Sequence, residues 1–174
     1  MKIHHVKKAR KDYPEAGIKK GESYYWWKPR YGGIRRSKTY PSRQELTQSD
    51  FLCRVYDIED ELNSIEIDIE GKSREEIEQE IENELQGIIG EIEDLRDECE
   101  EKLDNMPEQL QDTSDAGMLL QERIEALDEW ISDLESIDIN IEEEEELEKM
   151  DEMELQVRID KILDEISECC YGGS

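Results

Sequence analysis

The sequence predicts a mainly α protein: an elongated antiparallel helical hairpin or coiled-coil bundle with a small β-hairpin at its N-terminus. Three observations support this fold class. Several segments carry apolar residues at helical spacing, one N-terminal segment combines aromatic residues with a Gly-Gly turn, and charge is divided unevenly. Residues 1–50 hold 13 Lys and Arg against 5 acidic residues, and residues 51–174 hold 9 against 44. We therefore expect a basic module, residues 1–41, and an acidic helical body, residues 42–174.

The N-terminal module is expected to contain an arm followed by a β-hairpin. Residues 1–21 are basic and rich in turn-forming residues, which indicates an extended or loosely ordered arm. The aromatic run 24–27 has high strand propensity, Gly32-Gly33 can supply the positive φ angles of a tight turn, and residues 34–40 form the return strand. Pro29 cannot donate to a strand ladder, so the first strand should lie at an edge or bulge there.

The clearest predicted helix covers residues 73–104. Its apolar residues recur every three or four positions from Ile77 to Leu103, which places them in one stripe on one helix face. Ser73 and Glu76 have the spacing of a capping box. Comparable stripes predict helices at about 114–137 and 142–170. The spacing is close to 3.5 residues, which suits bundle or coiled-coil packing.

A further helix is predicted over residues 42–70, starting at a second capping box formed by Ser42 and Glu45. Gly71 is placed to end it, and only Lys72 separates Gly71 from the next helix. So short a connection favours an αα-hairpin between helices 42–70 and 73–104, with one bent helix as the alternative. Gly87 and Gly90 lie inside the second helix, where they would permit a close helix approach.

The sequence lacks the motifs of the common enzyme classes. It contains no P-loop, GxGxxG or HExxH motif and no Ser-His-Asp set, and its carboxylates alternate along exposed faces rather than forming a buried pair. The four cysteines show no CxxC spacing, and Cys169-Cys170 is interpreted as a helix end. We therefore expect no enzymatic activity, no cofactor and no metal site. No signal peptide or apolar span is present, which predicts a cytoplasmic protein without membrane association.

The most specific local pattern is the interleaving of aromatic and basic residues in the predicted hairpin. Cations contact phosphates and aromatic rings stack on bases, so these residues are candidate anchors for nucleic acid or for a protein partner. The alternative is that the tryptophans form a small core that joins the hairpin to the first helix, with the basic residues neutralising nearby acids. The candidate anchors are Tyr24, Tyr25, Trp26, Trp27, Lys28, Arg30, Tyr31, Arg35, Arg36 and Lys38.

This pattern resembles a known DNA-binding module. Residues 18–55 are similar to the small three-stranded arm-binding domain at the N-terminus of phage-type tyrosine integrases, in which an aromatic-basic run and a glycine turn precede a helix. The catalytic residues of that family have no counterpart here, so recombinase activity is not implied. More widely, the segment from Lys8 through Ser37-Lys-Thr, with Gln48-Ser-Asp-Phe and Asn105-Met-Pro-Glu, resembles uncharacterised phage and prophage proteins. That resemblance implies a mobile-element origin.

The acidic body is the second candidate surface. Residues 51–174 carry a formal charge of −35, and two helices of about 45 Å each could display a charge density comparable to that of duplex DNA. Such a surface could occupy the basic cleft of a DNA-binding protein; the alternative is that acidity only keeps a helical protein soluble. The candidate surface residues are Glu75, Glu78, Glu82, Glu93, Asp94, Glu142, Glu143, Glu144, Glu145 and Glu146.

These observations favour a non-enzymatic interaction protein whose acidic helical surface engages a basic, nucleic-acid-binding partner, in the manner of a DNA mimic or inhibitor. The first alternative is a DNA- or RNA-binding protein that uses the basic aromatic hairpin, with the acidic helices serving dimerisation or recruitment. The second alternative is a structural coiled-coil component. Homodimerisation, and whether the helices pack within one chain or between chains, is left open by the sequence.

Overall fold

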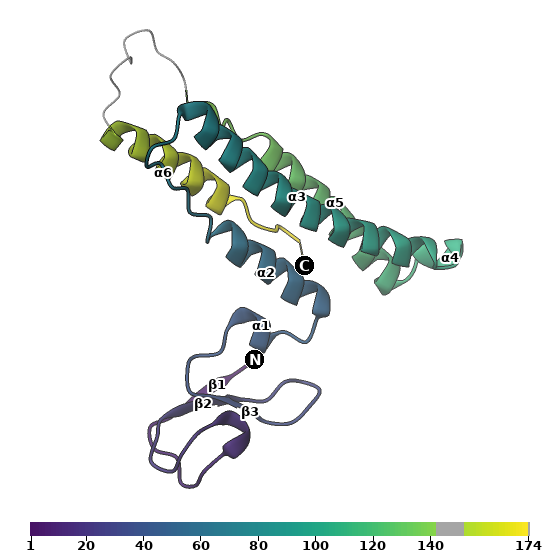
Figure 1. Cartoon of the computed structure of the whole chain (residues 1–174). Helices are drawn as coiled ribbons and strands as arrows, with labels where there is room; N and C mark the ends of the chain where they lie inside the picture. The colour runs from purple at the N-terminus through teal and green to yellow at the C-terminus, as the bar shows by residue number, and fades with distance from the viewer. Residues whose placement is uncertain (142–151, 174) are drawn as a thin grey trace. The chain divides into compact units, whose positions relative to one another are not determined.

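A computed structural model describes residues 1–141 and 152–173 and divides the chain into two compact units, Met1–Asp57 and Ile58–Ser174 (Figure 1). Basic and acidic residues are distributed unequally between these two units. The first unit holds 14 Lys and Arg against 6 acidic residues, and the second holds 8 against 43. The division falls within helix α2 (Asp50–Leu62), whereas the sequence placed it at residue 41.

The N-terminal unit contains a three-stranded antiparallel sheet in the order β1-β2-β3. Its strands are β1 (Ile3–Val6), β2 (Tyr24–Trp27) and β3 (Arg35–Ser37). Trp27 lies opposite Ile3 on one side and Arg35 on the other, so the aromatic strand is central. The small hairpin expected from the sequence is therefore present as β2 and β3, with a third strand added.

The expectation of a loosely ordered arm over residues 1–21 is wrong. Residues 3–6 form β1, and a 3₁₀ turn η1 (Pro14–Ala16) is closed by Gly17, whose φ is +64°. The apolar residues of this segment explain its order, since Ala9 and Ile18 are buried with Tyr24 in one small core. Because most residues of segment 1–21 are charged or polar, these few apolar positions are hard to recognise as a core in the sequence.

The connection between β2 and β3 is a loop over residues 28–34 rather than the expected two-residue turn. Lys28-Pro29 follows β2 directly, and proline offers no N–H to continue the ladder. The loop is held by Gln48, whose side-chain oxygen accepts from the Tyr31 N–H at 3.2 Å and whose amide donates to the Tyr31 carbonyl. Gly32 supplies the required positive φ of +125°.

The predicted helix over residues 42–70 is wrong as a single element. The capping box at Ser42 and Glu45 forms as predicted, but it starts only the short α1 (Arg43–Leu46). Ser49 then begins α2, because its hydroxyl accepts the Leu52 N–H at 3.3 Å as an N-cap does. After α2 the chain is non-helical to Ser73, and Gly71, with φ +73°, lies in the turn before the next helix.

The acidic unit is built on a hairpin of two long helices (Figure 1). Helix α3 (Arg74–Asp104) matches its predicted bounds and its capping box, and α5 (Asp115–Glu135) lies inside the predicted 114–137. They run antiparallel and are joined through the short α4 (Glu108–Gln111). The hairpin thus pairs α3 with α5, not helices 42–70 and 73–104. Helix α6 (Glu152–Glu168) falls inside the predicted 142–170, of which residues 142–151 lie outside the described chain.

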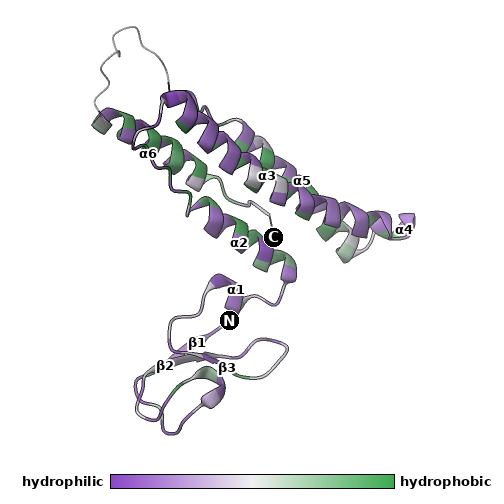
Figure 2. Ribbon diagram, in the orientation of Figure 1, coloured by the Kyte–Doolittle hydropathy of each residue, from purple (hydrophilic) through white to green (hydrophobic). Residues whose placement is uncertain are grey.

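The core of the acidic unit is the predicted stripe of α3 together with matching stripes of α5 and α6. Seven of the eight apolar stripe residues of α3, from Ile77 to Cys99, are buried. Coloured by hydropathy, the helices show green inner faces and purple outer faces (Figure 2). The residues buried from the other helices are Leu127, Trp130, Ile131, Leu134, Ile159, Ile162 and Ile166.

Two non-helical segments of the acidic unit share one sequence pattern. Residues 64–69 read Ser-Ile-Glu-Ile-Asp-Ile, and residues 136–141 read Ser-Ile-Asp-Ile-Asn-Ile. In both, among the described residues, the isoleucines are half-buried or buried and the residues between them are exposed. The alternation has the period of two that extended chain imposes. The repeat therefore marks two extended connections between helices.

Candidate interaction surfaces

The ten candidate anchors of the N-terminal unit divide into buried and exposed residues. Strand alternation sends Tyr24 and Trp26 to one face of the sheet, where Tyr24 is buried beside Ile18. Trp27 points to the other face and is 1% exposed. Tyr24 and Trp27 therefore serve the internal packing of the unit. The core alternative gave that role to both tryptophans, and Trp26 is only half-buried. The expectation that the aromatic strand lies at an edge because of Pro29 is wrong, since β2 is the central strand and ends at Trp27, before the buried Pro29.

Tyr25 and Trp26 are half-buried and stack on the two histidines of the neighbouring strand. The rings of Trp26 and His4 lie 4.2 Å apart at 9°, and those of Tyr25 and His5 lie 4.7 Å apart at 23°. Each pair joins residues that face each other in the β1–β2 ladder, the position in which cross-strand side chains interact most directly. The sequence showed both histidines but not this pairing, because β1 was not predicted.

The exposed part of the aromatic-basic segment is the β2–β3 loop and the cations around it. Tyr31 is 72% exposed, with the Arg30 guanidinium 5.5 Å from its ring centroid. Lys28, Arg35 and Lys38 are exposed as well. This surface joins an exposed aromatic ring to several cations, the combination that contacts nucleic acid or an acidic protein.

Two cations of this surface are engaged within the unit. The Arg36 guanidinium lies 3.3 Å from the Glu15 carboxylate and 4.2 Å from the centroid of Tyr13. Lys38 Nζ lies 3.2 Å from Glu22, whose pKa is lowered chiefly by the backbone N–H of Lys19 and then by Lys38. Both cations are thus paired with acidic residues of their own unit, Arg36 with η1 and Lys38 with the segment before β2.

A cavity of about 260 Å³ opens beside Trp27 and the start of β3. Its polar groups are largely bonded to one another, since Arg35 Nη1 donates to the Glu45 carbonyl at 3.2 Å. The Trp27 indole N–H has no hydrogen-bond partner in the described chain, and its atom is sealed from solvent. We assign no ligand to this cavity. The lining residues are Glu15, Ala16, Trp27, Ile34, Arg35, Arg36 and Glu45.

The acidic candidate residues lie along α3 and mostly face solvent. Glu75, Glu82, Glu93 and Asp94 are exposed. Glu78 differs, because it is half-buried and its Oε1 accepts the Ile141 N–H at 2.5 Å, which ties the second extended segment to α3. The run from Glu142 to Glu146 lies outside the described residues.

Charge on the hairpin is organised around one arginine. Arg96 of α3 contacts Asp97 at 3.0 Å, Asp128 of α5 at 3.3 Å and Glu100 at 4.0 Å. The hydrogen bond that Arg96 donates to the Asp97 carboxylate is the main cause of the raised pKa of Arg96. The Asp128 contact crosses from α3 to α5, so this arginine links the two acidic helices. Another carboxylate, Glu76, has its pKa lowered by the backbone N–H of Ser73, as a capping box requires.

Among the described residues, no group of three or more histidine, cysteine or carboxylate side chains is arranged to hold a metal ion. None of the described helices combines the length and apolar character that crossing a bilayer requires. Comparisons with models of protein families, with curated proteins and with solved structures found no match to this chain. Evidence for a function therefore comes from the two surfaces themselves.

Proposed function

We propose that this is a non-enzymatic interaction protein whose acidic α3–α5 hairpin engages the basic, nucleic-acid-binding surface of a partner protein. The observation that carries the proposal is the spacing of charge along α3. Its 31 residues hold 14 acidic and 3 basic side chains. At about 1.5 Å per residue, one carboxylate falls every 3–4 Å, roughly the phosphate spacing along one DNA strand. A basic groove that holds a phosphate backbone would therefore attract this helix.

The hairpin presents this charge on a stiff support. One face of α3 is buried along most of its length, and the exposed carboxylates occupy the remaining faces. A packed helix keeps such charges at fixed spacing, so binding costs little ordering entropy. An acidic chain that only needed solubility would not require this regular display.

The test is displacement of DNA from basic proteins. Full-length protein is titrated into complexes of a fluorescent 20-base-pair duplex with a panel of purified nucleic-acid-binding proteins at about 0.15 M salt, where non-specific attraction is screened. We expect displacement from at least one of them. The E75Q/E82Q/E93Q/D94N variant should displace at least about tenfold less, because four exposed charges are lost. Full displacement by the variant, or none by the native protein across the panel, would contradict the proposal.

A second function is favoured by the exposure of Tyr31 beside Arg30. On this hypothesis the N-terminal unit binds DNA or RNA, and the acidic helices dimerise or recruit. Fluorescence anisotropy of labelled single-stranded DNA would then show salt-sensitive binding that R30Q and Y31A both weaken. Trp27 is a poor test residue, since its burial makes loss of folding and loss of binding indistinguishable. Mobile-element origin stays a prediction from the sequence resemblance, and a structural coiled-coil role is the remaining alternative.

A further inference from the structure

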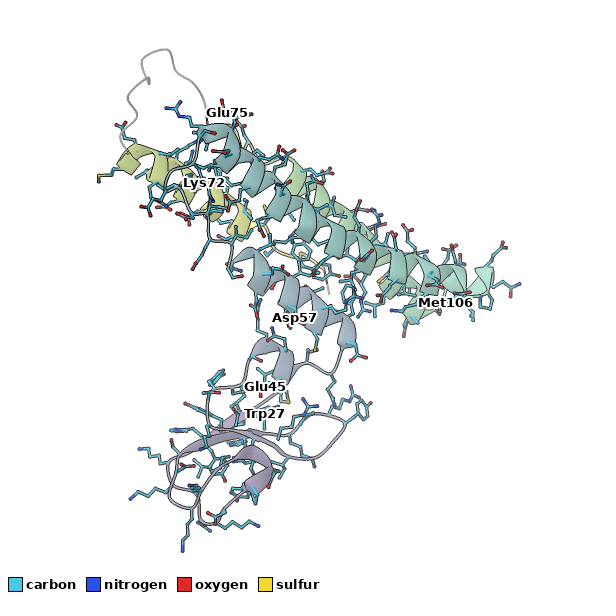
Figure 3. All side chains as sticks on the ribbon, viewed as in Figure 1. Trp27, Glu45, Asp57, Lys72, Glu75 and Met106 are labelled. Atoms are coloured by element: carbon cyan, nitrogen blue, oxygen red, sulfur yellow. The ribbon has the colours of Figure 1, made fainter. Side chains whose placement is uncertain are left out.

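The apolar stripes of α3 and α5 meet in a seam along the hairpin. This seam continues past the part of the hairpin that α6 covers. On α3 the stripe is buried from Ile77 to Cys99 but half exposed at Leu103. On α5 it is buried from Leu127 to Leu134 but half exposed at Ile124. Figure 1 shows α6 alongside only the part of the hairpin far from α4. At the end near α4, where Figure 3 labels Met106, none of the described helices lies over the continuation of the seam.

The uncovered seam forms a groove between the two helices. We call it the tip groove, and its volume is about 340 Å³. Leu103 and Ile124 provide its apolar part, and carboxylates surround them. Two other apolar side chains at this end of the hairpin, Leu110 and Met118, are 46% and 47% exposed. The lining residues are Glu100, Leu103, Asp104, Gln121, Ile124 and Glu125.

The charge around the groove selects its occupant. Glu100 is 4.0 Å from Arg96, whereas Asp104 and Glu125 have no ion-pair partner in the described chain. An apolar strip bordered by carboxylates is complementary to an amphipathic helix that carries Lys or Arg beside its apolar face. The same groove of a second copy would bring carboxylate against carboxylate, which opposes a tip-to-tip dimer.

We propose that the tip groove is the specific docking site for a basic amphipathic helix of the partner protein. This inference rests on the proposed function and deepens it: long-range attraction comes from the whole hairpin, and recognition comes from the groove. The apolar side chains of the partner helix, repeated every three or four residues, enter between Leu103 and Ile124. Its cations lie against Glu100, Asp104 and Glu125.

The experiment compares two labelled peptides of identical composition on the full-length protein. Each has about 14 residues of Leu and Lys; one has leucines at helical spacing and the other is scrambled, so net charge is equal. Anisotropy is read at about 0.15 M salt. We expect the amphipathic peptide to bind about tenfold more tightly than the scrambled one. The I124Q variant and the E100Q/E125Q variant should each remove most of that preference.

Matched controls separate the groove from general acidity. E154Q/E168Q removes two exposed carboxylates from α6, off the hairpin, and V157Q changes an exposed apolar residue of the same helix. Both should bind the amphipathic peptide within about twofold of the native protein. Far-UV circular dichroism verifies that every variant is folded, and the purely polar E100Q/E125Q change avoids the core altogether.

Four results would overturn the docking site. Equal binding of the two peptides, or equal weakening in the controls, would leave the electrostatic proposal standing and reject the groove. Absence of binding by both peptides rejects the groove alone if DNA displacement succeeds, and rejects the proposed function as well if displacement fails. Concentration-dependent self-association in sedimentation experiments that I124Q abolishes would make a second copy the occupant.

Discussion

One side chain of α5, Trp130, contacts the residues that follow α6. The Trp130 indole N–H donates to the Cys169 carbonyl at 3.2 Å, and the Trp130 and Tyr171 ring centroids lie 6.2 Å apart. Burial raises the pKa of the Cys169 thiol and raises the pKa of Tyr171 to about 12. The residues after α6 are thus packed against α5.

Tyr171 should make the stability of the protein depend on pH in the alkaline range. An unfolded tyrosine has a pKa of about 10, and the folded value is about 12, so folding favours the neutral phenol. The stability that this contributes is complete below about pH 10 and is lost as pH rises to about 12. In urea unfolding from pH 9 to 12, the native protein should therefore lose stability more steeply than Y171F. Parallel curves for the two proteins would contradict this prediction.

Residue type was enough to identify the candidate anchors, but it could not show which of them are buried and which are exposed. The sequence contains Trp26 and Trp27 as equals, and only the strand geometry buries one and stacks the other on His4. Likewise Glu78 and Glu82 look alike in the sequence, whereas the structure engages Glu78 with the Ile141 N–H. Such differences depend on contacts between residues far apart in the sequence, which apolar periodicity along the chain does not report.

At the scale of elements, capping boxes and apolar stripes predicted α3 and α5 nearly to the residue. The error at 42–70 has a physical cause. Residues 64–70 contain isoleucines, whose spacing of two suits an extended chain, yet selected isoleucines can also be matched to a helical stripe. Counting every position would have shown the alternation. The tip groove could not be predicted for another reason. It lies beyond the part of the hairpin that α6 covers, and the position of α6 on the hairpin is set by tertiary packing.

Two glycines inside helices should respond in opposite ways to alanine. No heavy atom of the described chain lies within 4 Å of a Cβ placed on Gly87, so the expected close helix approach is absent there. Gly87→Ala should therefore stabilise the protein by about 1 kcal/mol. A Cβ on Gly117 would overlap the carbonyl oxygens of Leu110 and Gln111, and Gly117→Ala should cost about 1–3 kcal/mol. Thermal and urea unfolding of the two variants measure both effects; equal shifts would contradict them.

At the scale of the whole molecule, the dominant feature is the separation of charge between the units. Met1–Asp57 carries a formal charge of +8 and Ile58–Ser174 carries −35. The sign change was visible in the sequence, where a division between residues 50 and 51 gives the same two charges. The acidic unit folds against its own repulsion, and only a few ion pairs such as Arg96–Asp128 offset it.

This repulsion should make added salt stabilising. Raising NaCl from about 0.02 to 0.5 M shortens the Debye length from roughly 20 Å to a few Å and screens the many carboxylate pairs more than the few close ion pairs. We expect the midpoint of the helical unfolding transition to rise by at least about 2–4 °C, the equivalent of roughly 1 kcal/mol. Circular dichroism at 222 nm follows the transition. A falling midpoint would mean that ion pairs outweigh repulsion.

The two Ser-Ile segments have a consequence for handling the protein. Isoleucines alternating along an extended chain are also a template for intermolecular β-pairing, and charged residues between them are what normally prevents it. In residues 64–70 that protection comes entirely from carboxylates, Glu66, Asp68 and Glu70. Acidification toward the isoelectric point of about 4.3 removes the net charge that keeps the molecules apart, while the isoleucines stay unchanged. The carboxylates keep the molecules apart at neutral pH, so we expect aggregation to begin at these segments as the pH falls toward the isoelectric point.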